Sequence, residues 1–215
     1  MSGKKKEYSE IRKCMRPGDV IAFGGRKITS RIIRWCTRSN VSHVGVVIQT
    51  NLLEGELSDR DFFNQVVEAT AAGVKFALLS GEVEFYKGEL WWFPLSEAAR
   101  EKLCLKAFFD SLFAQAGKPY DSPQAFTLGL RNLFKRNRSA EDSNTEDSNK
   151  KDSERFFCSE LVAKALRDGG VIGDIDPKTV TPIKLLGQFD IYAGHYVQFK
   201  GKKQKAVRGL KKLSS

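Results

Sequence analysis

Histidine and closely spaced cysteines are scarce in this sequence. Its 215 residues include two histidines, His43 and His195, and four cysteines, at positions 14, 36, 104 and 158. No pair of them has the short spacing of zinc ligands, so we expect no metal site. No glycine-rich phosphate loop or dinucleotide fingerprint occurs, and we expect no cofactor. Unpaired cysteines are typical of proteins in a reducing compartment.

Long apolar runs are missing too. No stretch approaches the roughly 20 apolar residues of a membrane span. The start, MSGKKKEYSE, has no apolar segment behind its charges and therefore does not resemble a secretory signal. Serine at position 2 replaces the glycine that N-myristoylation requires. These absences predict a cytoplasmic protein, and its oligomeric state stays open.

Charge is unevenly distributed. The net charge is +10, and residues 200–215 hold seven basic residues and no acid. We expect this basic tail to be attracted to an anionic membrane or to nucleic acid, although a merely solubilising tail is the alternative. Residues 137–154 hold no large apolar side chain, which predicts a disordered insertion. The predicted folded domain is therefore 8–199, followed by the tail at 200–215.

Hydrophobic periodicity predicts a mixture of strands and helices. Short apolar runs bounded by turn residues indicate strands at 18–24, 43–48, 65–70, 73–79, 90–95 and 189–199. Helical spacing with capping residues indicates helices at 29–39, 96–117, 122–134, 159–170 and 181–188. Because the strands cluster in sequence instead of alternating with helices, we predict an α+β fold with a largely antiparallel sheet.

Three residues suggest thiol chemistry. Cys158 lies where FFCSELV enters a helix, and unpaired first-turn amides there favour a thiolate. His43 begins an apolar strand and has the pKa of a general base. Glu68 lies among apolar residues in QVVEAT and needs a partner, for which the His43 ring is suitable. Taken singly, each residue has a structural reading: a packed thiol, a packed imidazole, and a carboxylate paired with any nearby lysine or arginine.

The motifs around these residues resemble a known family. GKPYDS at 117–122 and FFCSELV at 156–162 are similar to the NlpC-type cysteine peptidases, in which a G-x-P-Y segment precedes the nucleophile motif. Here RPGDVIAF and SHVGVVI come before the cysteine, an order that resembles the circularly permuted, papain-like YiiX/YebB group of hydrolases. The resemblance implies a permuted papain-like fold with Cys158 as nucleophile, His43 as base and Glu68 as the residue that orients it. It also implies that Tyr120 supports the oxyanion or leaving group. Phe157 and Glu160 depart from the pattern, which has aspartate and glycine there.

Three classes of function follow. The first is a cysteine hydrolase that cleaves an amide bond in a peptide or isopeptide. The second is a lipid-directed thiol acyl-enzyme, which resembles the lecithin–retinol acyltransferase type, although FCSEL lacks the N-C-E-H motif of that family. The third is a basic binding protein without catalysis. The corresponding partners are a peptide-like substrate, an acyl substrate, and an anionic surface contacted by the tail.

Overall fold

The computed structural model describes the chain except for residues 26–38, 52–61, 71–72, 117–156 and 211–215. Its centre is a seven-stranded sheet with the order β1-β7-β6-β2-β3-β4-β5. The β1–β7 pair is parallel and every other pair is antiparallel. The strands are β1 Ser2–Lys5, β2 Val20–Gly25, β3 His43–Asn51, β4 Phe62–Thr70, β5 Gly73–Leu78, β6 Gly88–Phe93 and β7 His195–Lys200. The predicted α+β class is confirmed.

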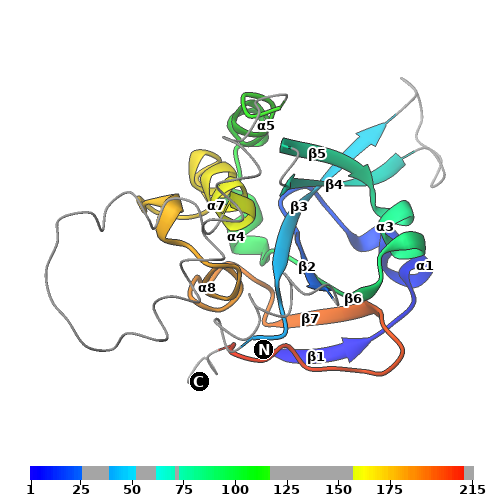
Figure 1. Cartoon of the computed structure of the whole chain (residues 1–215). Coiled ribbons are helices and arrows are strands. Elements are labelled where there is room, and N and C mark those ends of the chain that lie inside the picture. Colours follow the sequence, from blue (N-terminus) through cyan, green and yellow to red (C-terminus); the bar gives the residue numbers. More distant parts are fainter. Residues whose placement is uncertain (26–38, 52–61, 71–72, 117–156, 211–215) are drawn as a thin grey trace, which may run out of the picture.

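Helices cover both faces of this sheet (Figure 1). The α-helices are α1 Tyr8–Ile11, α3 Leu79–Phe85, α4 Glu97–Lys102, α5 Leu105–Phe113, α7 Phe157–Asp168 and α8 Pro182–Gly187. Two short 3-10 helices are η1 Arg12–Cys14 and η2 Pro177–Thr179. In Figure 1, α4, α5, α7 and α8 lie on one side of the sheet, and α1 and α3 on the other.

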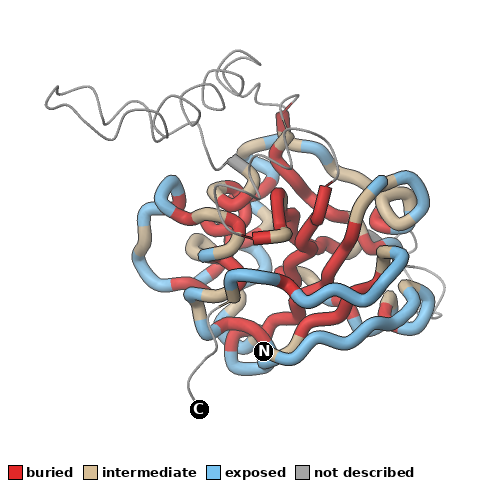
Figure 2. Tube along the Cα trace, turned by 60° about the horizontal axis from the view of Figure 1, so that its bottom comes forward, coloured by how far each residue is buried: buried red, intermediate tan, exposed pale blue. Residues whose placement is uncertain are grey.

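The core is correspondingly divided into two clusters. Strand residues alternate between them because successive side chains point to opposite faces. Val44 and Val46 join the larger cluster with the α7 residues Leu161 and Val162, whereas Val47 joins the smaller cluster on the other face. Figure 2 shows that the central strands are buried. Continuous apolar runs such as VIAF and VVI are explained by this double burial.

The structure corrects one predicted helix. Residues 96–117 were expected to form a single helix capped by Ser96, and the cap is present, with Ser96 Oγ accepting from the Ala99 amide. The helix is instead interrupted at Leu103 and Cys104, which have extended backbone. The Cys104 amide donates to the Gly169 carbonyl at 2.9 Å, beyond the end of α7. This long-range bond, together with the packing of Leu103 against Gly169, favours a break that helical periodicity does not reveal.

The last strand is shorter than predicted, and one strand was not predicted at all. β7 begins at His195, directly after Gly194, whose positive φ of 76° turns the chain. β1 has the sequence SGKK, which has no apolar side chain, and it forms because its backbone pairs with β7. The helices predicted over 29–39 (apart from Ser39) and 122–134 and the insertion at 137–154 lie outside the described residues.

The first part of the basic tail, residues 200–210, which we call the basic segment, packs on the sheet. Val207 is buried in the larger core cluster, and its amide donates to the Tyr196 hydroxyl at 3.0 Å. The Trp91 indole donates to the Lys205 carbonyl at 3.0 Å. The Arg208 amide donates to Asn40 Oδ1 at 2.8 Å. The folded body thus extends beyond the predicted boundary at residue 199, and β1 extends it before residue 8.

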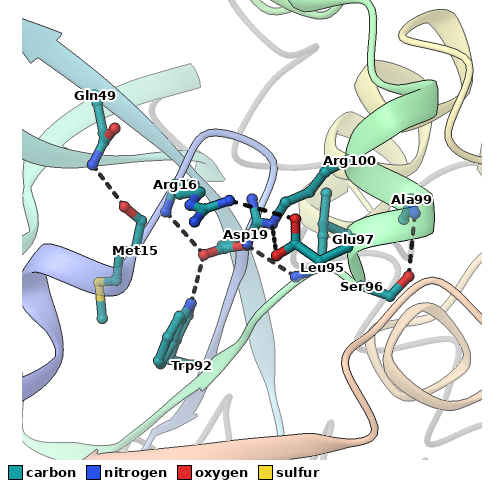
Figure 3. A network of polar contacts seen from close by, with 10 residues as sticks. All are labelled: Met15, Arg16, Asp19, Gln49, Trp92, Leu95, Ser96, Glu97, Ala99 and Arg100. Carbon is teal, nitrogen blue, oxygen red and sulfur yellow. Dashed lines mark hydrogen bonds and ion pairs between the residues drawn. The ribbon is translucent and has the colours of Figure 1, made fainter.

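A buried carboxylate joins β2, β6 and α4 at the end of β2 away from His43 (Figure 3). Asp19 is fully buried and accepts from the Arg16 amide at 3.0 Å, the Leu95 amide at 2.9 Å and the Trp92 indole at 2.8 Å. Arg100 completes the set with an ion pair of 2.6 Å. Asp19 therefore has a structural role, and it holds the turn that leads into β2.

Candidate active site

The Cys158 side chain lies where two strands of the sheet separate. The β3–β4 pairing runs from Asn51 opposite Phe62 to Val46 opposite Val67. Beyond that point, the first residues of β3 pair with β2 and the last residues of β4 pair with β5. The first turn of α7 faces this gap, because α7 packs against both β3 and β4.

Two backbone amides point at the sulfur. Cys158 is the second residue of α7, and its thiolate accepts from the amides of Val44 and Ser159. The Val44 amide is available because the β3–β4 pairing has ended before it. The Ser159 amide belongs to the first turn of α7, where backbone amides point out of the helix end. The gap in the sheet and the helix terminus thus both stabilise negative charge on the same sulfur.

His43 connects this thiol to a buried carboxylate. Its side chain is hydrogen-bonded to Cys158, and its Nε2 lies 2.6 Å from Glu68 Oε2. The His43 and Phe23 rings pack in a T-shaped arrangement, with 5.2 Å between centroids. The side chain of Glu68 is 7% exposed and that of His43 is 25% exposed. The carboxylate is therefore shielded, whereas the imidazole remains within reach of solvent.

Lys75 holds the other oxygen of Glu68. The two residues are opposite each other in the β4–β5 ladder, and Lys75 Nζ lies 3.5 Å from Glu68 Oε1 and 2.7 Å from Glu82 Oε1. Side chains of alternating charge are therefore in contact one after another, in the order Glu82, Lys75, Glu68, His43 and Cys158. Sequence reasoning missed Lys75, because only the strand register identifies which lysine faces Glu68.

These contacts shift the pKa values in opposite directions. Burial disfavours the imidazolium, but the charge of Cys158 and the hydrogen bonds that the imidazolium donates to Cys158 and Glu68 raise the pKa of His43 to about 10. Burial raises the pKa of the Cys158 thiol, but the charge of His43 and the two amide hydrogen bonds lower it overall. Burial likewise opposes ionisation of Glu68, whose pKa is lowered overall by His43 and Lys75. The arrangement favours a thiolate–imidazolium pair near neutral pH.

Gly45 makes room for the contact between Glu68 and His43. A Cβ atom at this position would lie 2.5 Å from Val66 Cγ2 and 3.3 Å from the Glu68 Cβ. Gly45 and His43 are two residues apart in β3 and so share a face of the sheet. The glycine in S-H-x-G thus has a steric explanation.

The structure brings three of the four predicted site residues together. His43, Glu68 and Cys158 form one connected group, as just described. Tyr120 lies outside the described residues. His195 lies at the start of β7, and its Nδ1 contacts the Ala193 carbonyl at 3.2 Å, apart from this group.

Neither a metal site nor a membrane span is found among the described residues. Their histidine, cysteine, aspartate and glutamate side chains form no group of three or more that could hold a metal ion. Their helices are all too short or too polar to cross a membrane.

Comparison with known proteins finds distant matches among the solved structures. No family model matches the sequence, and no curated protein does. A crystal structure of the metalloprotein YiiX from Escherichia coli O157:H7 is similar to this structure, with a TM-score of 0.42 and 23% sequence identity. The match covers 72% of this chain and 66% of the YiiX chain. YiiX is a member of the group that the sequence motifs resemble.

Proposed function

We propose that this chain is a cysteine hydrolase that cleaves an amide bond, in a peptide or isopeptide, through a covalent thioester. The observation that supports this most is the continuous contact from Cys158 through His43 to Glu68, with two amides directed at the sulfur. A purely structural thiol needs neither a charged imidazole nor a buried carboxylate behind it.

The reaction divides into two acyl transfers. The Cys158 thiolate attacks the carbonyl carbon, and negative charge develops on the carbonyl oxygen, toward which the Cys158 amide can donate. The His43 imidazolium gives its proton to the leaving amine as the carbon–nitrogen bond breaks, which leaves a thioester on Cys158. His43, now neutral, removes a proton from water. The resulting hydroxide attacks the thioester and releases the carboxylic acid, and the thiolate–imidazolium pair is restored.

Glu68 serves as the positioning residue for this cycle. Its contact with Nε2 keeps the ring oriented and leaves Nδ1 for the sulfur, the reacting water and the leaving group. Lys75 keeps Glu68 ionised throughout, because protonation of the carboxylate would break two ion pairs.

A lipid-directed acyl-enzyme is the second candidate, and one observation favours it. Contacts of Ser39 Oγ with the Arg208 carbonyl at 2.9 Å and of Asn40 Nδ2 with the Ala206 carbonyl at 2.8 Å bring the basic segment next to the start of β3. The candidate site thus lies close to cationic side chains that would attract anionic lipid.

Covalent trapping tests the proposal. A peptidyl chloromethyl ketone and a fatty-acyl chloromethyl ketone would be incubated separately with the full chain, and the adduct located by peptide mass spectrometry. We expect alkylation at Cys158 that is lost in Cys158→Ala and strongly slowed in Glu68→Ala. A faster reaction with the peptidyl reagent supports the amide substrate, and a faster reaction with the acyl reagent supports the lipid candidate. A folded chain that reacts with neither reagent at Cys158 would instead favour the non-catalytic binding protein.

A further inference from the structure

The candidate site and the carboxyl end of β7 lie at the same end of the sheet. His43 is opposite Phe23, Phe23 is opposite Leu90, and Leu90 is opposite Lys200. These four residues form one row across β3, β2, β6 and β7. With neighbouring strands about 4.8 Å apart, the row is about 14 Å long. The loop that follows Lys200 therefore begins at the same end of the sheet as His43, three strands away.

Both termini contribute lysines to this end. The Lys6 amide donates to the Gln198 carbonyl at 3.0 Å, and Gln204 Nε2 donates to the Gly3 carbonyl at 3.3 Å, so the residues after β7 run beside β1. Figure 1 shows β1, β7 and the red carboxyl-terminal segment side by side. We name the exposed lysines gathered here the basic rim: Lys4, Lys5, Lys6, Lys87, Lys202 and Lys203. Three exposed acids, Glu7, Glu10 and Glu84, border it and still leave an excess of positive charge.

An exposed aromatic residue lies next to the basic rim. Phe85 is 74% exposed at the end of α3, two residues before Lys87. The Lys200 ammonium donates to the carbonyls of Val83 and Glu84, which places this end of α3 against β7. A large apolar side chain that is exposed among lysines is typical of protein surfaces that insert into the headgroup region of a bilayer.

We propose that the basic rim and Phe85 dock this end of the sheet on an anionic phospholipid bilayer. The lysines would lie at the headgroups and Phe85 would insert between them. In this orientation the entrance to Cys158 faces a substrate presented at the membrane surface. The docking is independent of catalysis, whereas delivery of a membrane-associated substrate to Cys158 rests on the function proposed above.

Lipid fits these side chains better than nucleic acid does. Lysine binds as a compact point charge, which suits the diffuse negative charge of a lipid surface. Nucleic-acid binding surfaces rely on arginine and on several aromatic side chains that stack on bases. Arg208 is the only arginine between residues 200 and 210. Of the large apolar side chains that are exposed in the described part of the chain, Phe85 alone lies at this end of the sheet.

Vesicle flotation of the full chain tests the docking. Vesicles of phosphatidylcholine alone would be compared with vesicles that also contain phosphatidylserine. We expect binding only to the latter, weakened by salt. The double variant Lys202→Glu/Lys203→Glu should bind about tenfold more weakly or worse, because each lysine near an anionic surface contributes severalfold to the affinity.

A charge-matched variant serves as the control. Lys102→Glu/Lys106→Glu changes the net charge equally, on exposed positions at the end of α4 and in α5, and α5 lies at the opposite end of the view from β1 in Figure 1. It should bind like the unmodified chain. In a Phe85→Trp variant, fluorescence emission should shift to shorter wavelength with phosphatidylserine vesicles, and Phe85→Ser should weaken binding.

Several results would overturn the proposal. One is equal binding of the unmodified chain to both kinds of vesicle. Another is an equal loss of vesicle binding in the two charge-reversal variants. A third is a Phe85→Trp emission maximum that does not shift when the protein binds vesicles. Binding to single-stranded nucleic acid without binding to vesicles would also overturn it. Cys158→Ala should still bind vesicles. If Cys158 proves unreactive while the rim-dependent binding persists, the proposed function fails and the docking stands.

Discussion

At the scale of single residues, the candidate site depends on one proton shared between sulfur and nitrogen. The lowered pKa of Cys158 and the pKa of His43 near 10 define a wide interval in which the thiolate–imidazolium pair exists. Each partner stabilises the charged form of the other, so the loss of either changes the protonation of the one that remains.

The pH dependence of alkylation follows from this pairing. With iodoacetamide, Cys158 should still react well below the pKa of about 8.5 of an ordinary thiol. Its rate should fall as the pH drops through its lowered pKa. His43→Ala removes the cation, so the profile of Cys158 should move to higher pH and the rate at neutral pH should decrease. Mass spectrometry of each peptide would measure this, with the exposed Cys14 and Cys104 as internal references. A profile unchanged by His43→Ala would contradict the pairing.

Lys75 is expected to influence the reactivity of Cys158 through its contact with Glu68. Lys75→Met leaves Glu68 with His43 as its only ion-pair partner among the described residues, so the carboxylate should become easier to protonate. The acidic limb of the Cys158 alkylation profile should then shift to higher pH, and Lys75→Arg should restore it. Glu82→Gln removes the competing contact of Lys75 and leaves the ammonium with Glu68, so the acidic limb should not move to higher pH. Identical profiles for Lys75→Met and the unmodified chain would exclude the role.

At the scale of elements, the site depends on the place where β3 leaves β4. The strands remain close enough at Gly45 that a methyl group would meet Val66 Cγ2 at 2.5 Å. The separation exposes the Val44 amide to Cys158, whereas the close approach brings Glu68 to His43.

Gly45→Ala should therefore disturb both stability and reactivity. Overpacking of this kind costs about 1–3 kcal/mol, and displacement of Glu68 from His43 should slow Cys158 alkylation at neutral pH. Gly81→Ala is a matched control, since a Cβ in that α3 position meets nothing within 4 Å. Thermal unfolding of both variants would show a lower Tm only for Gly45→Ala. Equal Tm values for the two variants would mean that β3 and β4 accommodate the added methyl group without cost.

The buried contacts of Asp19, which connect β2, β6 and α4, are a second feature at this scale. Asp19→Ala leaves the Arg100 guanidinium and the Trp92 indole without their buried acceptor. Breaking a buried pair of this kind costs about 3–5 kcal/mol of unfolding free energy. Glu97→Ala is the surface comparison. Glu97 contacts Arg100 at 3.8 Å but is 77% exposed, so its removal should cost no more than about 1 kcal/mol. Chemical denaturation would measure both, and similar losses would contradict the assigned structural role of Asp19.

At the scale of the whole molecule, β1 and residues 201–210 both pack against the end strands of the sheet. Residues 201–210 supply acceptors to Trp91 and Gln198 and a buried side chain, Val207. This part of the basic segment belongs to the folded body and also carries two lysines of the basic rim.

Truncation after Phe199 should consequently destabilise the protein. The Trp91 indole and the Tyr196 hydroxyl would lose their partners, and each unsatisfied buried group costs about 1–3 kcal/mol. Lys202→Ala/Lys203→Ala removes charge without removing these contacts, and its Tm should stay close to that of the unmodified chain. A truncated chain with an unchanged Tm would show that the segment contributes charge alone.

Local pattern was sufficient to predict most elements and three residues that meet at the candidate site. The strands containing VIAF, VVI and LWWF were recognisable from apolar runs between turn residues, and the helices after Ser96 and Thr181 from their capping residues. Cys158, His43 and Glu68 were selected from their local settings, and the resemblance of the surrounding motifs to a known family supplied their expected roles. All of these signals lie within a few residues of the group concerned.

Tertiary structure decided everything that depends on pairing between distant segments. The separation of β3 from β4, the choice of Lys75 as the partner of Glu68, and the break at Leu103 each depend on strand register or on helix packing. The strand SGKK exists only because β7 offers it an edge, and residues 201–210 pack only because Trp91, Tyr196 and Asn40 meet them. The physical reason is that backbone hydrogen bonds between segments far apart in the chain are almost independent of side-chain identity, so no local pattern encodes which segments will meet.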